Sequence, residues 1–311
     1  MNRQNHMKNN PQISDIEHQT SVFRTVYIVG PTASGKTATS IKLAQLLGDA
    51  EIVAADSQTV RQHLDIGTAK PTVEERGDIV HHGIDIIDIY DDFTLHDYLT
   101  YARAAIADIH ARGKRAIVVG GTGLYIDALY YDFELPVIER NEQEQRADYE
   151  SMSVTKLQEL IRSRDLGMPE NERNKRHLVN TLMRGGLRGT KGEPDPHALI
   201  VGLQPPREVL QERIDARVED MYAHGFLDEV HSIITCFGRP PRSFDAIGYR
   251  IALRVVDGEI DVQTAIELQK TADRQYARRQ ISWFKRNQAI KWFDDSEQAF
   301  AYLCSVFAPR V

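Results

Sequence analysis

The stretch that decides the fold is Val26-Tyr-Ile-Val29-Gly30-Pro-Thr-Ala-Ser-Gly35-Lys36-Thr37. It begins with four apolar residues, which is typical of a short buried β-strand. A glycine-rich turn follows. Beyond it, Ile41, Ala44 and Leu47 recur at the spacing of one face of a helix. The stretch therefore predicts a strand, a tight turn and a helix in direct succession.

The turn fits the pattern G-x-x-x-x-G-K-[ST] at every fixed position. Glycines let the backbone aim its amide hydrogens at phosphate oxygens, and the following helix adds the positive end of its dipole. Lys36 adds a full charge, and the Thr37 hydroxyl is placed to ligate Mg²⁺. We therefore expect a di- or triphosphate here. The expected contact residues are Gly30, Pro31, Thr32, Ala33, Ser34, Gly35, Lys36 and Thr37.

Further short apolar runs alternate with helical patterns along the chain. Ile52–Ala55, Ala116–Val119 and Leu199–Leu203 predict buried strands, and the apolar positions between Tyr98 and Ile109 follow a helix. This alternation predicts an α/β fold, a P-loop NTPase-like parallel sheet flanked by helices. In such sheets, ligands bind beyond the carboxyl ends of the strands.

Two polar residues stand at these strand ends, Asp56 and Thr122. P-loop ATPases and GTPases usually carry an acidic residue where this chain has Gly120-Gly-Thr122-Gly, and the base-reading pattern N-K-x-D of G proteins is absent from the sequence. The residues fit a small-molecule kinase in which Asp56 accepts a substrate proton. They equally fit a reaction in which the loop holds a diphosphate leaving group.

Composition narrows the class of protein. The chain has 311 residues, with 41% hydrophobic and 27% charged residues, which is a globular profile. No apolar run approaches the roughly 20 residues of a membrane span. Two cysteines, Cys236 and Cys304, cannot form a disulfide framework and fit a reducing compartment. The net charge of −7 gives no sign of nucleic-acid binding, which would have to come from local basic patches.

Domain organisation follows from changes in pattern along the chain. Residues 1–22 are polar and predict a disordered leader, without the apolar core of a secretory signal. Residues 136–186 are highly charged and helical in period, so we expect a small helical insertion domain. The P-loop catalytic core then comprises 23–135 and 187–311, and it is mostly helical after Pro206.

Several segments resemble one family, the tRNA dimethylallyltransferases (tRNA isopentenyltransferases) of bacterial type. The matching segments are 30–37, Ala55-Asp-Ser57, Asp65-Ile-Gly-Thr-Ala-Lys-Pro71, His81-His-Gly-Ile-Asp85, Gly120-Gly-Thr-Gly-Leu-Tyr125, Gly225-Phe-Leu-Asp-Glu-Val230, Ala246-Ile-Gly-Tyr-Arg250, Tyr276-Ala-Arg-Arg-Gln280 and Trp283-Phe284. They run in family order from about Val26 to Trp292.

The resemblance implies an activity and a role for each site. The family transfers the dimethylallyl group of dimethylallyl diphosphate to the N6 amine of adenine 37 in tRNA. By resemblance, the loop holds the diphosphate with Mg²⁺ bound at Thr37, and Asp56 is the general base. Thr122 positions the amine, and Arg217 is a further diphosphate contact.

The resemblance also implies how tRNA is bound. The insertion would clamp the anticodon stem-loop, in a cytoplasmic, monomeric enzyme that needs no membrane. Basic residues gather in 173–191 and 274–291. The expected tRNA contacts are Asp56, Ser57, Gln58, Thr59, Thr122, Arg146, Arg176, His177, Asn180, Gly248, Tyr249, Arg250, Arg278, Arg279 and Gln280.

The chain departs from the family pattern at two places. The family reads Asp-Ser-x-Gln-Val-Tyr after its second strand, where this chain has Thr59 and Arg61 in place of Gln and Tyr. In the insertion, the family pattern Arg-x-x-Arg-Ala-Leu-Glu is replaced by one with His177 and Asn180 at the arginine positions.

Other interpretations stay open at this point. One is an adenylate isopentenyltransferase, with the same chemistry on free AMP or ATP; others are a P-loop small-molecule kinase and an RNA-binding protein with a degenerate site. We expect His81 and His82 to have a structural or substrate-loop role rather than to bind a metal. Trp283 and Phe284 are predicted to be core anchors of a helix.

Overall fold

The computed structural model describes residues 23–136, 143–187, 189–239 and 246–307, so the expected leader lies outside it. The described residues fall into two compact units. The larger unit comprises the chain up to Tyr130 and from Asp195 onward, and the smaller unit is Tyr131–Pro194. Each unit is described here by itself.

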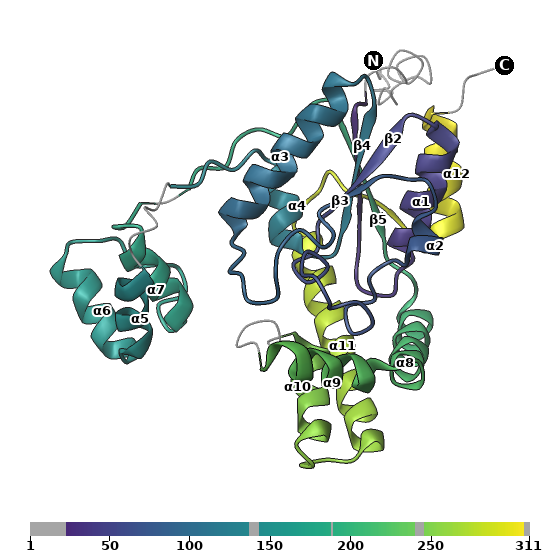
Figure 1. Ribbon diagram of the computed structural model, residues 1–311. Coiled ribbons are helices and arrows are strands. Elements are labelled where there is room, and N and C mark those ends of the chain that lie inside the picture. Colours follow the sequence, from purple (N-terminus) through teal and green to yellow (C-terminus); the bar gives the residue numbers. More distant parts are fainter. Residues whose placement is uncertain (1–22, 137–142, 188, 240–245, 308–311) are drawn as a thin grey trace, which may run out of the picture. The chain divides into compact units, whose positions relative to one another are not determined.

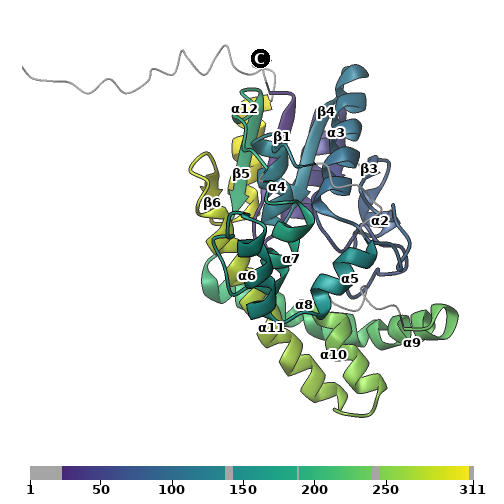
Figure 2. The same ribbon diagram turned by 90° about the vertical axis from the view of Figure 1, so that its left-hand side faces the viewer.

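A six-stranded parallel sheet forms the centre of the larger unit, in the order β3-β2-β4-β1-β5-β6 (Figure 2). Its strands are β1 (Thr25–Val29), β2 (Ala50–Ala54), β3 (His81–His82), β4 (Arg115–Gly120), β5 (Ala198–Leu203) and β6 (Lys291–Phe293). The predicted parallel sheet is confirmed, with all four predicted strands. The edge strands β3 and β6 were not predicted, because two or three residues carry no readable alternation.

Helices cover both faces of the sheet (Figure 1). On one face lie α1 (Lys36–Leu47) and α12 (Ser296–Phe307), which pack against each other, and on the other lie α3 (Leu95–Ala111) and α4 (Gly123–Tyr130). The predicted helices after the glycine turn and between Tyr98 and Ile109 are confirmed as α1 and α3. This layering explains why the strands are apolar along their whole length.

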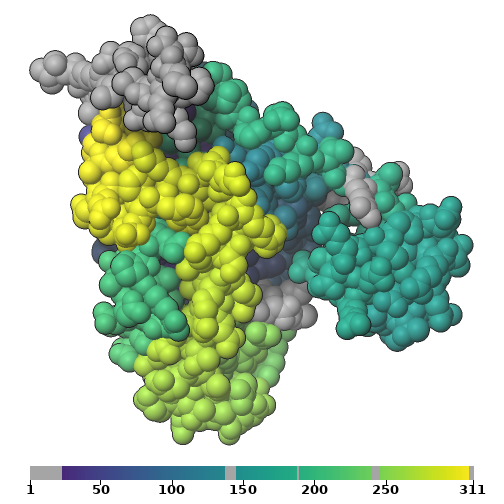
Figure 3. Space-filling model, turned by 180° about the vertical axis from the view of Figure 1, so that it is seen from behind, coloured from purple at the N-terminus to yellow at the C-terminus, as the bar shows by residue number. Residues whose placement is uncertain are grey.

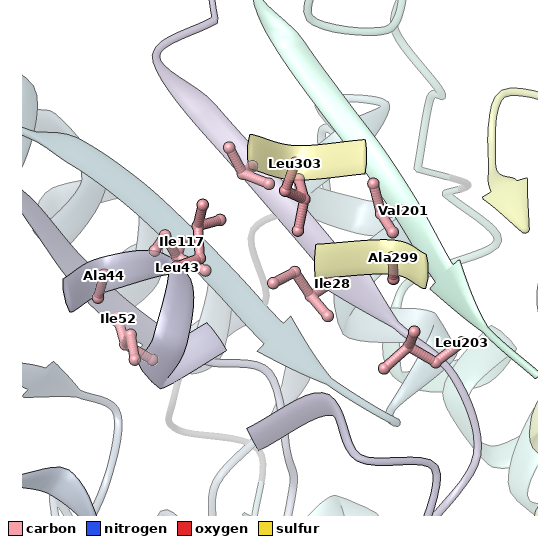
Figure 4. Close-up of a cluster of buried hydrophobic side chains, with 10 residues drawn as sticks. Ile28, Leu43, Ala44, Ile52, Ile117, Val201, Leu203, Ala299 and Leu303 are labelled. Carbon is pink, nitrogen blue, oxygen red and sulfur yellow. The ribbon is translucent and has the colours of Figure 1, made fainter. Parts of the chain in front are cut away.

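The main core lies between the sheet and the α1–α12 layer. Figure 4 shows Leu43 of α1 and Leu303 of α12 close to Ile28, Ile117 and Val201 of the strands. All five side chains are fully buried. This packing fixes β1 and α1, and with them the turn that joins the strand to the helix.

The remaining helices of the larger unit lie beyond the carboxyl edge of the sheet. They are α2 (Val73–Arg76), α8 (Arg207–Ala223), α9 (Phe226–Phe237), α10 (Ile247–Val256) and α11 (Val262–Phe284). Figure 3 shows the residues from α11 to α12 as a continuous yellow band down one face. Phe284 of α11 is fully buried and Trp283 half-buried, so the predicted core position is confirmed for Phe284. Within the described chain, no helix combines the length and apolarity needed to cross a membrane.

The smaller unit is helical, with α5 (Gln143–Ser151), α6 (Val154–Ser163) and α7 (Lys175–Met183) around a core that includes Tyr149, Leu157 and Leu178. It extends beyond the predicted limits 136–186 at both ends. The extension arises because the entering and leaving segments pair: Glu134 and Thr190 exchange backbone hydrogen bonds of 3.1 and 3.0 Å. This pairing is an isolated bridge rather than a strand.

A buried carboxylate joins β2 to the edge of the sheet. Glu51 is 2% exposed and accepts hydrogen bonds from both Arg112 side-chain amines, from Lys114 at 2.8 Å and from His82 at 2.8 Å. The Arg112 guanidinium holds the pKa of Glu51 well below its usual range. His82 therefore has the structural role that was expected for it.

We expect Glu51→Gln to lower the free energy of unfolding by about 3 kcal/mol, because it removes the charge of a buried carboxylate that pairs with basic side chains. The extra stability of the wild-type protein is fully present above the pKa that a glutamate has in the unfolded state. It is lost as the pH falls below that value toward the folded-state pKa, which is depressed. Denaturant unfolding at pH 7 and at about pH 3 measures both effects.

The matched control is Glu297→Gln, which breaks the exposed ion pair of Glu297 with Lys42. Exposed pairs contribute at most about 1 kcal/mol. Equal losses for the two variants would contradict the role assigned to the buried carboxylate.

Candidate active site

The glycine turn is shaped by positions that only glycine can occupy. Gly30 has φ +149° and Gly35 has φ +93°, and a Cβ at Gly30 would lie 2.4 Å from the Leu203 carbonyl oxygen. Gly35 ends the turn, and α1 begins at Lys36. The Lys36 amine donates a 2.5 Å hydrogen bond to the Pro31 carbonyl, which holds it across the turn. The loop and the Lys36 amine therefore form one cradle at the N-terminus of α1.

The ends of β2 and β4 are tied together beside this cradle. Asp56 accepts a 2.8 Å hydrogen bond from the Gln58 amide, and the Ser57 amide donates to the Thr122 hydroxyl at 3.2 Å. Thr122 also forms a side-chain hydrogen bond with Tyr276 of α11. Asp56 and Thr122, predicted at neighbouring strand ends, are thus held in one small network.

Gln280 of α11 links the glycine turn after β1 to the loop after β4. Its Oε1 accepts from the Thr32 amide at 2.8 Å, and its Nε2 donates to the Gly121 carbonyl at 2.9 Å. A Cβ at Gly121 would lie 2.2 Å from that Nε2, so a glycine is required there. Gln280 is 6% exposed, and its amide is engaged inside the protein. Gln280 also lines the cavity described below, and its contact with tRNA stays a prediction.

A cavity of about 890 Å³ contains the cradle and extends away from it. Its walls come from the loop and α1, from the segments after β2, and from α8, α10 and α11. Charged side chains in these walls are Lys36, Lys42, Asp56, Glu75, Arg213, Arg217 and Asp273. Gly67, Ala246, Ile247 and Gly248 contribute an uncharged part.

Burial changes the pKa values of the charged groups. Removal from water lowers the pKa of Lys36 to about 8; the carboxylate of Asp56 opposes this change and the charge of Arg217 adds to it. Burial also lowers the pKa of Arg217 and raises that of Asp273, with each partly stabilising the charge of the other. A cavity with desolvated cations favours binding of a multiply charged anion.

The segment after Asp56 is supported from α9. The Glu229 carboxylate accepts from the amides of Asp65, Ile66 and Gly67 at 3.0, 2.7 and 3.2 Å, and from the Tyr249 hydroxyl. The Tyr249 side chain is fully buried, and the contact of this residue with tRNA stays a prediction. Its neighbour Gly248 lines the cavity, as do Ser57, Gln58 and Thr59.

Arg61, at the position of the family's tyrosine, is a structural brace. It is 8% exposed, and its guanidinium donates to the Asp91 carbonyl at 2.7 Å. The side chain therefore faces the protein interior rather than a ligand.

The other predicted tRNA contacts lie on helix surfaces. In the larger unit, Arg250 is exposed on α10, and Arg278 and Arg279 are exposed on α11. In the smaller unit, Arg176 and His177 are exposed on α7. The remaining two contact each other: Arg146 donates to the Asn180 side chain at 3.3 and 3.4 Å.

On α11, sequence reasoning missed three residues of the cavity wall, Gln269, Asp273 and Tyr276. With Gln280 they recur at four-, three- and four-residue steps along α11, so they share one face of the helix. That periodicity of polar residues within an otherwise amphipathic helix was the available signal. The charge pattern of 274–291 drew attention to the opposite, exposed arginines instead.

A phosphate loop at the head of a parallel sheet, beside a carboxylate at the next strand end, defines a P-loop enzyme that acts on a phosphorylated substrate. The chain belongs to the IPP transferase family. The sequence model of that family matches residues 59–287, and a second model, described as isopentenyl transferase, matches residues 24–80.

Individual relatives agree with this assignment. The chain is 36% identical to tRNA dimethylallyltransferase 2 of Syntrophus aciditrophicus, over 88% of this chain and 93% of the relative. It is similar in structure to a full-length tRNA isopentenylpyrophosphate transferase from Bacillus halodurans, with TM-score 0.69, 33% identity, and coverage of 91% and 96%. A eukaryotic dimethylallyltransferase acting on tRNA gives TM-score 0.72 at 26% identity, covering 88% and 74%.

We expect Gln280→Leu to lower the free energy of unfolding by about 1–3 kcal/mol, because a buried amide and a buried carbonyl lose their partners. Affinity for an alkyl diphosphate should fall as well, since the Thr32 backbone is no longer held. Denaturant unfolding and titration calorimetry measure the two effects. Gln275→Leu, at an exposed position of the same helix, is the control; equal behaviour of the two variants would contradict the link between the loops.

The lowered pKa of Lys36 predicts a pH dependence of anion binding. The free amine loses its proton above about pH 8, whereas a bound diphosphate favours the charged form. Binding must therefore take up a proton at higher pH, and the affinity falls by up to about tenfold per pH unit.

Titration calorimetry with an alkyl diphosphate between about pH 7 and pH 10, in buffers of different ionisation enthalpy, measures this proton uptake. Lys36→Arg keeps its charge throughout the range and should show no such fall. A flat wild-type profile would exclude Lys36 as the titrating group.

Proposed function

We propose that this protein transfers the dimethylallyl group of dimethylallyl diphosphate to the N6 amine of adenine 37 in tRNA. The observation that carries the proposal is the single cavity in which the phosphate cradle and the Asp56 carboxylate meet. The walls of that cavity offer cations to a diphosphate, and a base and uncharged residues to a nucleobase. The names of two relatives, a tRNA dimethylallyltransferase and a dimethylallyltransferase acting on tRNA, support the same substrates.

The cradle suits a leaving group. In the reaction, the bond between the allylic carbon and the diphosphate oxygen breaks, and a bond from that carbon to N6 forms. Negative charge grows on the diphosphate as the bond breaks. Lys36 and Arg217 line the cavity and are largely removed from water, where stabilisation of such a developing charge is strongest.

Asp56 suits the general base. An aromatic amine becomes strongly acidic as it is alkylated, so a nearby carboxylate can accept the proton that N6 loses. The bond from the Gln58 amide fixes one carboxylate oxygen and leaves the other for the substrate. The Thr122 hydroxyl, held by Ser57 and Tyr276, is placed to orient the same amine.

The loop also fits a magnesium ion. Thr37 is exposed in the cavity wall directly after Lys36. In the part of the chain that the structure describes, no group of three or more histidine, cysteine or carboxylate side chains could hold a metal. Mg²⁺ would therefore be held by Thr37 and the diphosphate oxygens, an arrangement that this ion commonly adopts. When bound, it would neutralise charge on the departing diphosphate.

The smaller unit supplies basic groups for the anticodon stem-loop. Arg146 lies close enough to Arg184 to lower the pKa of Arg184, in addition to the larger effect of burial. Arg146 also forms an ion pair with Glu150 at 2.9 Å. Two neighbouring cations attract a phosphate backbone. His177 and Asn180 replace arginines of the family pattern, so these cations take a larger share of the contact. An enzyme with tRNA as substrate would act in the cytoplasm, and we propose that it does so as a monomer.

The proposal is tested by incubation with labelled dimethylallyl diphosphate and either tRNA or AMP, and in parallel with γ-labelled ATP. Label on tRNA, located at adenine 37 by nucleoside mass spectrometry, is the expected result. Label on AMP alone would establish the adenylate-specific reaction instead. Transfer of the ATP phosphate to a small molecule would establish a kinase.

We expect Asp56→Asn to lower the single-turnover rate by about 10²–10⁴, because the amine proton has no acceptor. The asparagine oxygen can still accept from the Gln58 amide, so the loop keeps its shape and tRNA affinity should change little. Rapid-quench kinetics and filter binding measure the two quantities. Full activity of this variant would remove Asp56 as the base.

A further inference from the structure

One face of α11 presents four polar side chains to the cavity, from Gln269 to Gln280. Two of them are engaged within the protein: Tyr276 bonds to Thr122, and Gln280 joins the two loops. Asp273 is different. Within the described residues, its carboxylate forms neither a hydrogen bond nor an ion pair, although only 8% of the residue is exposed.

The Asp273 carboxylate lines the cavity, so a ligand there can supply the hydrogen bond that a largely buried carboxylate requires. Arg217 lies near enough to favour the charge of Asp273 but does not form an ion pair with it. Asp273 and Asp56 also both act on the hydroxyl of Tyr276, which bonds to Thr122. The two carboxylates therefore line one cavity near the Thr122–Tyr276 pair.

The chemistry of the substrates identifies the missing donor; this step rests on the proposed function. The dimethylallyl group has no hydrogen-bond donor. The diphosphate is an acceptor and carries the same sign of charge as Asp273. Adenine has donor hydrogens in only one place on the base, the two hydrogens of its N6 amine.

We propose that the Asp273 carboxylate accepts a hydrogen bond from the N6 hydrogen that stays on the adenine, while Asp56 takes the other hydrogen as a proton. The balance is complete. The N6–carbon bond forms, the carbon–oxygen bond to diphosphate breaks, Asp56 gains one proton, and the product amine keeps one hydrogen. As N6 acquires positive charge in the transition state, the nearby Asp273 charge stabilises it.

The decisive variant is Asp273→Asn, which has the same shape without the charge. We expect its single-turnover rate on tRNA to fall by about 10- to 100-fold, the range of a charge-assisted hydrogen bond. The melting temperature of the free protein should stay equal or rise, because the uncompensated charge is gone. Affinity for an alkyl diphosphate should stay equal or increase, because a like charge is removed. Asp273→Ser, which keeps a neutral oxygen, is the second variant and should also react slowly.

Asp215→Asn is the matched control. Asp215 lies on α8 and forms an ion pair with Arg274 of α11. It therefore joins α8 and α11, the two helices that carry Arg217 and Asp273. We expect this variant to have a lower melting temperature and an unchanged single-turnover rate. It shows what a purely structural carboxylate does in this part of the molecule.

Three results would overturn the proposal for Asp273. An unchanged rate would show that it does not contact the amine. A lower melting temperature of Asp273→Asn would show a structural role. Weaker binding of the alkyl diphosphate would show that it positions Arg217. Failure of the proposed function itself is distinguishable, because the wild-type protein would then transfer no label to tRNA.

Discussion

Positive charge held away from water is the constraint on which the site depends. Lys36 and Arg217 lie in the wall of one cavity, and burial disfavours the charged form of both. Such charges persist only where a rigid framework holds them. Here the framework is the parallel sheet with α1 packed on it, which fixes the glycine turn against the end of β5. The stability of the layered core is thus the source of an electrostatic site that an anion completes.

The fold and the centre of the site were predictable because they depend on local pattern. The glycine turn, Asp56 and Thr122 each follow a recognisable apolar strand, and strand ends meet at one edge of a parallel sheet. The roles of individual residues on α10 and α11 were not predictable in this way. Gln280 and Tyr249 belong to segments that resemble RNA-contacting ones, yet tertiary packing buries both. Asp273 and Tyr276 reach the cavity from more than 150 residues beyond Thr122, at a distance in sequence that no local pattern bridges.

The domain limits show a related limit of sequence analysis. The charged, helical pattern located the smaller unit, but its ends are set by the pairing of Glu134 with Thr190. These two residues are far apart in the sequence and neither is part of a strand. A boundary that depends on one pair of backbone hydrogen bonds cannot be recognised from amino-acid composition. A helical core such as that of α5, α6 and α7 can be recognised from its apolar periodicity.

The position of Gln280 has a consequence for the order of events. A single carboxamide touches the backbone of the phosphate turn and the backbone after β4, which carries Thr122. In the proposed reaction, a substrate that orders either backbone would also order the other through Gln280, so the second substrate would lose less entropy on docking. The two substrates would then bind with positive cooperativity.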